Sequence, residues 1–176
     1  MRSEYIYEKA RGIVSRCGTR NTMEIAEELG IYVDYIDGLD KLLGMYTYQN
    51  KERHILLNSN MDDILTGMVC GHEIGHDILH REYAKASKHL PEFVLFDIRN
   101  RYEYEANAFA AHLMIDDDEL TDYIKDGYDV VQIAQMMNTN VNMMLIKLNE
   151  MNQLGWELKL PYVPRGDFLK SVRPEM

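Results

Sequence analysis

The chain of 176 residues has the length of one domain, or of one domain with a small appendage. Hydrophobic residues make up 46% and charged residues 27%, a composition that supports a folded core and excludes a disordered chain. The formal net charge of −10 and the pI of about 5.0 lack the basic footprint of a nucleic-acid-binding protein or of one drawn to anionic lipid. We therefore expect no direct contact with nucleic acid or with a membrane.

The cysteines and the N-terminal residues indicate the compartment. Cys17 and Cys70 are too few for a disulfide framework, so we expect two free thiols in a reducing environment. Residues 1–9 carry charges where a signal peptide needs an apolar run. No segment reaches the roughly 18 consecutive apolar residues of a membrane-spanning helix. These features predict a cytoplasmic protein.

The first third of the chain predicts two helices followed by three strands. Apolar residues at helical spacing, ended by Gly18 and Gly30, indicate the helices, and Asn21 or Thr22 can cap the second one. Alternating apolar and polar residues indicate the strands, with 50–52 as a hairpin loop. We expect a small three-stranded antiparallel sheet. The helices are predicted at 4–17 and 23–29, and the strands at 31–36, 43–49 and 53–58.

The remainder of the chain predicts further helices. A loop is expected at 87–91, and the proline-containing tail at 155–176 is expected to lie on the surface. The methionines concentrated in 136–151 indicate core packing or, alternatively, a partner-binding surface. The helices are predicted at 60–80, at 99–114, from a cap at 116–118 to about 125, and as a pair at 130–137 and 141–151.

The strongest chemical signal is His72-Glu73-Ile74-Gly75-His76, which matches the pattern H-E-x-x-H inside a predicted helix. Residues four apart share one helix face, so His72 and His76 can direct two imidazoles at one ion. Glu73 lies beside them and can act as general base on a water molecule that zinc acidifies to a pKa of about 7. The motif predicts a peptidase with one Zn²⁺ per chain, two histidine ligands and Glu73 as the catalytic residue.

The H-E-x-x-H pattern is short enough to arise by chance. The alternative interpretation is a pair of histidines on a helix face beside a glutamate in a salt bridge. The context favours the metal site, because Gly75 costs the helix roughly 1 kcal/mol relative to alanine. A glycine is understandable there if another backbone packs closely against the helix.

A catalytic zinc ion needs a third protein ligand, which we expect from the next long helix. Glu103 shares a face of that helix with Asn107, which places a carboxylate beside an amide able to orient a ligand histidine. Glu105 is the alternative ligand, but it lies about 200° around the helix and should face away. His80 lies about 12 Å along its helix from His72, too far to share the ion. We expect His80 to be a packed residue or to support a ligand from outside the coordination sphere.

The transition state of peptide hydrolysis also needs a donor for the oxyanion. The tyrosines and the remaining histidines offer many choices, and each can equally be a structural residue. Four candidates stay open at this point: Tyr46, Tyr48, His80 and His112.

The two helical motifs together resemble the ImmA/IrrE family of metallopeptidases. The family pattern is roughly H-E-x-G-H-x-x-L-H followed by E-x-x-A-N-x-F-A-x-x-L-M, and residues 72–80 and 103–114 match its two halves. The resemblance covers about residues 20–150, and the paired motifs are specific where either alone is not. The chain departs from the family at Ile115-Asp116, where many members have proline; this concerns the next helix and not the metal site. The resemblance implies His72, His76 and Glu103 as ligands and Glu73 as the base.

These features predict an α+β fold that is mainly helical, with a zincin-like active-site helix, a small sheet and a C-terminal helical pair. The glutamate as third ligand makes the site gluzincin-like. We expect residues 1–125 to form the metallopeptidase domain, with 126–176 packed on it as a helical pair and tail or joined with it in one unit. The pair is similar to a region that resembles a helix-turn-helix in relatives. In this acidic chain we interpret it as packing or substrate docking.

Members of the family typically cut a helix-turn-helix repressor encoded beside them in prophages, conjugative elements and stress regulons. The resemblance therefore implies a site-specific zinc endopeptidase that relieves repression. The alternative is a non-catalytic, metal-containing module that sequesters a repressor, which the intact Glu73 disfavours because a pure binder has no need of that carboxylate. A toxin-like or peptidoglycan-acting hydrolase is a third interpretation, and the lack of an export signal disfavours action on peptidoglycan.

Overall fold

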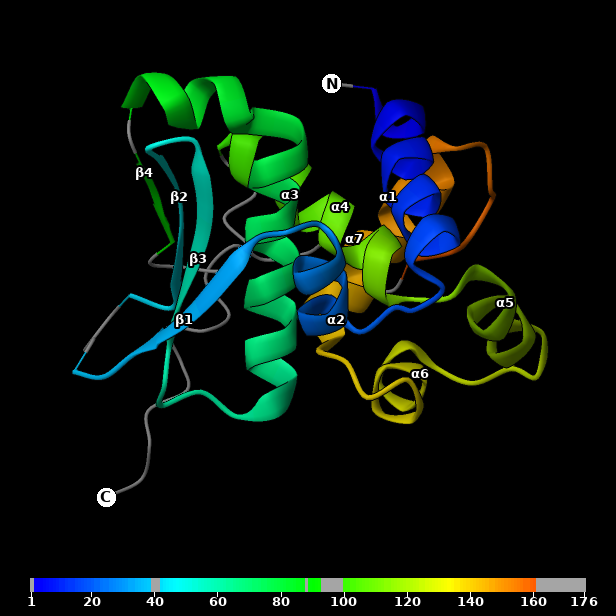
Figure 1. The fold of residues 1–176 in the computed structure, drawn as a ribbon. Helices are drawn as coiled ribbons and strands as arrows, with labels where there is room; N and C mark the ends of the chain where they lie inside the picture. Colours follow the sequence, from blue (N-terminus) through cyan, green and yellow to red (C-terminus); the bar gives the residue numbers. More distant parts are fainter. Residues whose placement is uncertain (1, 39–41, 88, 93–99, 161–176) are drawn as a thin grey trace.

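A long helix, α3 (Asp63–Ser87), stands between a small sheet and most of the other helices (Figure 1). The computed structural model describes residues 2–38, 42–87, 89–92 and 100–160. Apolar side chains from β-strands, α3 and α4 meet in one core, to which Ile55, Ile74 and Phe109 each contribute a fully buried side chain. The expected α+β fold, mainly helical with a small sheet, is confirmed.

The sheet has four strands in the order β1-β3-β2-β4 and is mixed. Strand β2 is antiparallel to both β3 and β4, whereas β1 is parallel to β3. We expected three antiparallel strands. The sheet instead has a fourth strand, and β1 is parallel rather than antiparallel to its neighbour β3. The fourth strand lies where we expected a loop, and α3 continues beyond residue 80. The strands are β1 (Tyr32–Ile36), β2 (Gly44–Gln49), β3 (Glu52–Asn58) and β4 (His89–Glu92).

A two-residue turn joins β2 to β3. Asn50 and Lys51 have φ angles of 51° and 69°, the left-handed values that a type I′ hairpin turn requires at both central positions. The predicted hairpin is confirmed, and its loop is one residue shorter than expected because Glu52 already belongs to β3.

The other predicted helices are all present, and most begin at a side-chain cap. Asn21, Asn100, Asp116, Asp129 and Asn140 each accept a hydrogen bond from a backbone N–H in the first turn that follows, which satisfies a donor the helix leaves unpaired. The helices are α1 (Ser3–Cys17), α2 (Thr22–Glu28), α4 (Arg101–Met114), α5 (Asp117–Lys125), α6 (Val130–Met136) and α7 (Val141–Gln153).

Glycine brings α3 and α4 into close contact. A Cβ atom at Gly75 would lie 3.0 Å from the carbonyl oxygen and 3.1 Å from the Cα of Ala106. These are backbone atoms, so the expectation that another backbone packs against Gly75 is confirmed. Ala106 and Ala110 on α4 are themselves fully buried. The small residues on both helices allow the two motifs to lie close together and face each other.

The C-terminal helix α7 packs against α4 through a buried charged cluster. Lys147 and Glu150 are fully buried on α7 and meet His112 of α4 and Asp117 of α5. The Nζ of Lys147 lies 3.1 Å from His112 Nδ1 and also pairs with Asp117. Tyr104 of α4 donates to Glu150. These contacts join α7 to the helices before it, while the proposed boundary at residue 125 stays a prediction.

Two further expectations concern the same end of the chain. Met143, Met144 and Met151 are buried in the core, which confirms the packing interpretation for these methionines, although Met136 is exposed. The tail beyond residue 160 lies outside the described residues. Within the ranges the structure describes, no helix is long and apolar enough to cross a bilayer.

Candidate metal and catalytic site

Three potential ligand atoms converge between α3 and α4. His72 Nε2 lies 3.0 Å from His76 Nε2 and 3.1 Å from Glu103 Oε2, and His76 Nε2 lies 3.4 Å from the same oxygen. Both imidazoles are buried, and the Glu103 side chain is 16% exposed. Such a group can hold a metal ion. The helical spacing that selected His72, His76 and Glu103 thus corresponds to a cluster in space.

The spacing within the cluster suits a tetrahedral metal ion. Metal–ligand bonds of about 2.0–2.1 Å at tetrahedral angles place neighbouring ligand atoms about 3.3 Å apart. The three observed separations, from 3.0 to 3.4 Å, bracket that value. Burial lowers the pKa of His76 to about 4, so its ring is neutral at pH 7 and keeps a lone pair for a cation. The residues present therefore fit a metal ion.

The Nδ1 atom of each of these two histidines contacts a neighbouring side chain. His72 Nδ1 lies 3.0 Å from Asn107 Oδ1, and His76 Nδ1 lies 3.0 Å from His80 Nδ1. An amide oxygen can only accept, so His72 carries its proton on Nδ1 and its Nε2 is left for the cluster. Asn107 is fully buried on α4, one turn after Glu103. Asn107 and His80 thus lie where residues that orient the two imidazoles are expected.

Glu73 follows His72 on α3 and is fully buried. Its carboxylate faces β2, where a Cβ atom at Gly44 would lie 3.1 Å from Glu73 Oε1 and 2.5 Å from Val69 Cγ1. Glycine at the start of β2 therefore leaves the room that the glutamate occupies. Gly44 is a residue of the site that sequence reasoning missed, because its role depends on how β2 packs against α3.

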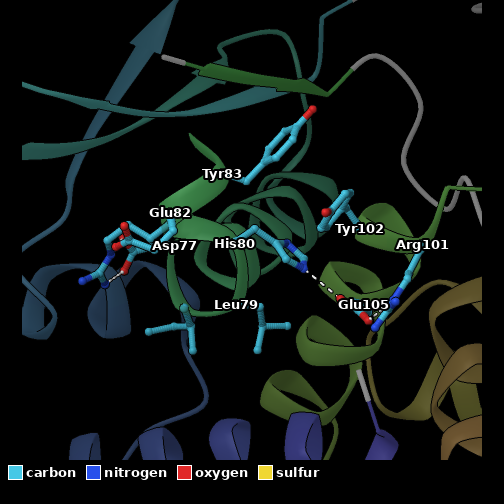
Figure 2. A pocket seen from close by; sticks show the side chains of 10 residues that line it. Asp77, Leu79, His80, Glu82, Tyr83, Arg101, Tyr102 and Glu105 are labelled. Atoms are coloured by element: carbon cyan, nitrogen blue, oxygen red, sulfur yellow. Dashed lines mark hydrogen bonds and ion pairs between the residues drawn. The ribbon is translucent and has the colours of Figure 1, made fainter. Parts of the chain in front are cut away.

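Glu105 does not join the three ligand atoms, as expected from its place on the helix, but it is not solvent-exposed either. It is 97% buried, and its Oε2 lies 3.0 Å from His80 Nε2. Arg101 donates to the other carboxylate oxygen at 2.9 Å. Figure 2 shows these side chains along a pocket that Tyr83 and Tyr102 also line. The pocket has a volume of about 440 Å³. His72, His76 and Glu103 are not among the residues that line this pocket.

The candidate oxyanion donors have contacts of their own. The buried Tyr46 donates to Asp77 at 2.6 Å, and burial raises its pKa above the usual value. Lys85 lies over the ring of the half-buried Tyr48. His112 belongs to the buried cluster around Lys147, and His80 contacts His76 and Glu105. The geometry selects none of the four as the oxyanion donor.

Comparisons with known proteins match the region that carries the cluster. The IrrE N-terminal-like domain of peptidase family M78 matches residues 26–149, which span both helical motifs. The chain is also similar to a protein of Bacillus phage phi105 named "Uncharacterized immunity region protein 2". The two are 30% identical over 124 residues, which cover 70% of this chain and 77% of the phage protein.

Proposed function

The chain belongs to the ImmA/IrrE metallopeptidases of peptidase family M78, and from this we propose that it is a zinc-dependent, site-specific endopeptidase of the cytoplasm that cleaves a helix-turn-helix repressor. Cleavage would relieve repression. The observation that carries the proposal is the convergence of His72, His76 and Glu103 beside a buried Glu73 in a member of this family. The relative's name, an immunity region protein of a phage, supports a repressor-related role.

The donor set is the one that catalytic zinc sites use. Two imidazoles and one carboxylate leave the fourth tetrahedral position open for water or substrate. In our proposal His72 Nε2, His76 Nε2 and Glu103 Oε2 hold the ion. When bound, zinc supplies Lewis acidity to water and to the scissile carbonyl.

The side chains around the cluster transfer the proton and orient the two imidazoles. The Glu73 carboxylate accepts a proton from the attacking water and passes it to the nitrogen of the leaving amine. Asn107 Oδ1 accepts from His72 Nδ1, and His80 Nδ1 accepts from His76 Nδ1, which keeps both Nε2 atoms unprotonated. Because Glu73 and both histidines are buried, bulk water competes little for these protons.

The charge of the chain is consistent with such a substrate. A DNA-binding repressor carries a basic surface, because it must neutralise phosphates. The peptidase has a formal net charge of −10. Opposite net charges steer two proteins together and raise their association rate at low salt. An acidic peptidase is therefore suited to a basic protein substrate.

The substitution Glu73→Gln tests the proposal. With a candidate helix-turn-helix repressor as substrate, we expect wild type to give two defined fragments in mass spectrometry. Loss of a general base costs typically 10²–10⁴-fold in rate, so kcat/KM should fall by about that factor. Zinc content by plasma mass spectrometry should stay at one per chain, because Glu73 is not a ligand in the proposal.

Glu82→Gln is the matched control. Glu82 lies on the same helix with its side chain 86% exposed, so its replacement should leave cleavage unchanged. Cleavage retained by the Glu73→Gln variant would refute Glu73 as the base. Binding of the repressor without cleavage, equal in wild type and Glu73→Gln, would instead show a non-catalytic module that sequesters the repressor.

A further inference from the structure

A chain of polar contacts leads away from the candidate metal site. His76 Nδ1 lies 3.0 Å from His80 Nδ1, His80 Nε2 lies 3.0 Å from Glu105 Oε2, and Arg101 Nε donates to Glu105 Oε1 at 2.9 Å. The first three residues are at least 96% buried. The pocket in Figure 2 reaches Arg101 and Glu105 at the end of this chain. His72 differs, because its supporting contact is the neutral amide of Asn107.

Only one arrangement of protons satisfies both histidine contacts when a metal ion occupies His76 Nε2. The proton of His76 must then lie on Nδ1, which donates to His80 Nδ1. His80 must carry its own proton on Nε2, which donates to Glu105 Oε2. A carboxylate oxygen accepts and does not donate, so Glu105 selects this tautomer of His80. The tautomer of His80 in turn selects that of His76.

We propose that Glu105 is a positioning residue of the metal site, which acts through His80 to hold His76 with Nε2 directed at the ion. A carboxylate behind an imidazole also raises the basicity of the ligating nitrogen. The inference rests on the proposed function, because it requires a metal ion at His72, His76 and Glu103.

Among the contacts of the Glu105 carboxylate, the one with His80 carries the positioning role. Arg101 has a side chain that is 74% exposed, and an ion pair in water contributes little. By contrast, the His80–Glu105 contact is buried on both sides. Asp77 shows that a buried carboxylate on α3 need not serve the site. It pairs with Arg53 and Arg81 and accepts from Tyr46.

Zinc affinity, measured by competition with a chromogenic chelator, tests the proposal without reference to cleavage. Glu105→Gln should weaken zinc binding about 10- to 100-fold, the range typical of residues that support a metal ligand. The glutamine amide can turn its NH₂ group toward His80 Nε2, so it no longer selects one tautomer, and it lacks the negative charge that raises the basicity of the imidazole. In His80→Asn the side-chain oxygen can still accept from His76, but the shorter side chain no longer reaches Glu105. In that background Glu105→Gln should have no further effect, because coupled residues are not additive.

Asp77→Asn is the matched control, since it removes a buried, ion-paired carboxylate next to His76 in the sequence. It should lower the Tm and leave zinc affinity within about twofold. Unchanged zinc affinity in Glu105→Gln overturns the proposal. So does an equal loss from Glu105→Gln in the wild-type and His80→Asn backgrounds, because Glu105 would then act independently of His80.

A measurement on the wild type covers the case in which Glu105→Gln does not fold. The ¹⁵N chemical shifts of His80 in the zinc-loaded protein should show the proton on Nε2, and a proton on Nδ1 overturns the proposal. A wild type that binds no zinc refutes both this inference and the proposed function. A wild type that binds zinc but cuts no repressor refutes the proposed substrate alone, and the affinities still decide the role of Glu105.

Discussion

At the scale of single residues, Gly44 defines the space around the proposed base. A Cβ atom there would lie 2.5 Å from Val69 Cγ1 and 3.1 Å from Glu73 Oε1. Val69 is β-branched and sits on a helix, so its side chain has one strongly preferred rotamer and cannot turn aside. Any side chain at position 44 must therefore displace β2, α3 or the carboxylate of Glu73.

We expect Gly44→Ala to destabilise the protein by about 1–3 kcal/mol, the usual range for overpacking, and to reduce cleavage more than this loss explains. Urea unfolding and kcat/KM at a temperature where the variant is folded measure the two effects. Gly12→Ala on α1 is the control, because among the described residues no atom outside its own helix backbone lies within 4 Å of a Cβ there. If Gly44→Ala behaved like Gly12→Ala, the steric argument would fail.

The cluster of His72, His76 and Glu103 could be predicted from the sequence, but the residues that contact it only in part. The 3.6-residue helical period relates His72 to His76 and Glu103 to Asn107 within one helix each. It does not say how two helices are placed against each other. Glu105 lies outside the cluster of His72, His76 and Glu103, as its place on the helix predicts, yet its contact with His80 could not be foreseen. Gly44 gave no signal because its role arises only where β2 meets α3.

At the scale of elements, the site depends on the distance between α3 and α4. Each helix contributes residues to the cluster of His72, His76 and Glu103, and Gly75 sets the separation of the helices by contact with the backbone of Ala106. Backbone atoms cannot change rotamer to make room. A methyl group at Gly75 must push the helices apart, and Glu103 lies less than one turn before Ala106 on α4.

Gly75→Ala should therefore lower zinc affinity and the Tm of the metal-free protein together, even though alanine is the better helix former. Gly71→Ala is the comparison, because the three atoms nearest to its Cβ would be side-chain atoms of Thr22, Met114 and Ala110, at 3.1 to 3.5 Å. Thermal unfolding in EDTA and in excess zinc should rank Gly75→Ala as the more damaging change. The reverse ranking would show that helix separation does not control the site.

Elements were easier to predict than their pairing. Helix ends could be predicted from the sequence because Asn and Asp caps and Gly18 act on the backbone of residues next to them. The direction of β1 was not visible, because alternation of side chains identifies a strand but not its neighbour. The chain passes from β1 to β2 and returns by the hairpin as β3, which inserts between them. No local sequence pattern predicts that insertion.

At the scale of the whole molecule, the buried cluster on α7 makes stability depend on pH. Burial lowers the pKa of His112, so this ring is neutral in the folded protein at pH 7. Lys147 and Glu150 of α7, Asp117 of α5 and Tyr7 of α1 face the ring. His112 therefore takes up a proton more readily in the unfolded chain.

The direction of the pH dependence follows from this difference in proton binding between the unfolded and the folded protein. Below a pH of about 6.5 the unfolded state binds more protons at this position, so the free energy of unfolding falls by up to about 1.4 kcal/mol per pH unit. His112→Asn keeps an acceptor for Lys147 and removes the titration. We expect a less stable protein at pH 7 but a shallower fall in stability between pH 7 and pH 5 in urea titrations. An unchanged slope would exclude His112 as a contributor.

The mixed sheet has a kinetic consequence. The β2–β3 hairpin closes through a two-residue turn and makes only local contacts, which form within microseconds in isolated hairpins. The parallel pairing of β1 must wait until β3 exists, because no earlier strand offers it an edge. The contact between His72 and Glu103 spans 31 positions in the chain and needs both long helices docked. We therefore expect assembly to run from the hairpin outward, with the cluster of His72, His76 and Glu103 complete only late in folding.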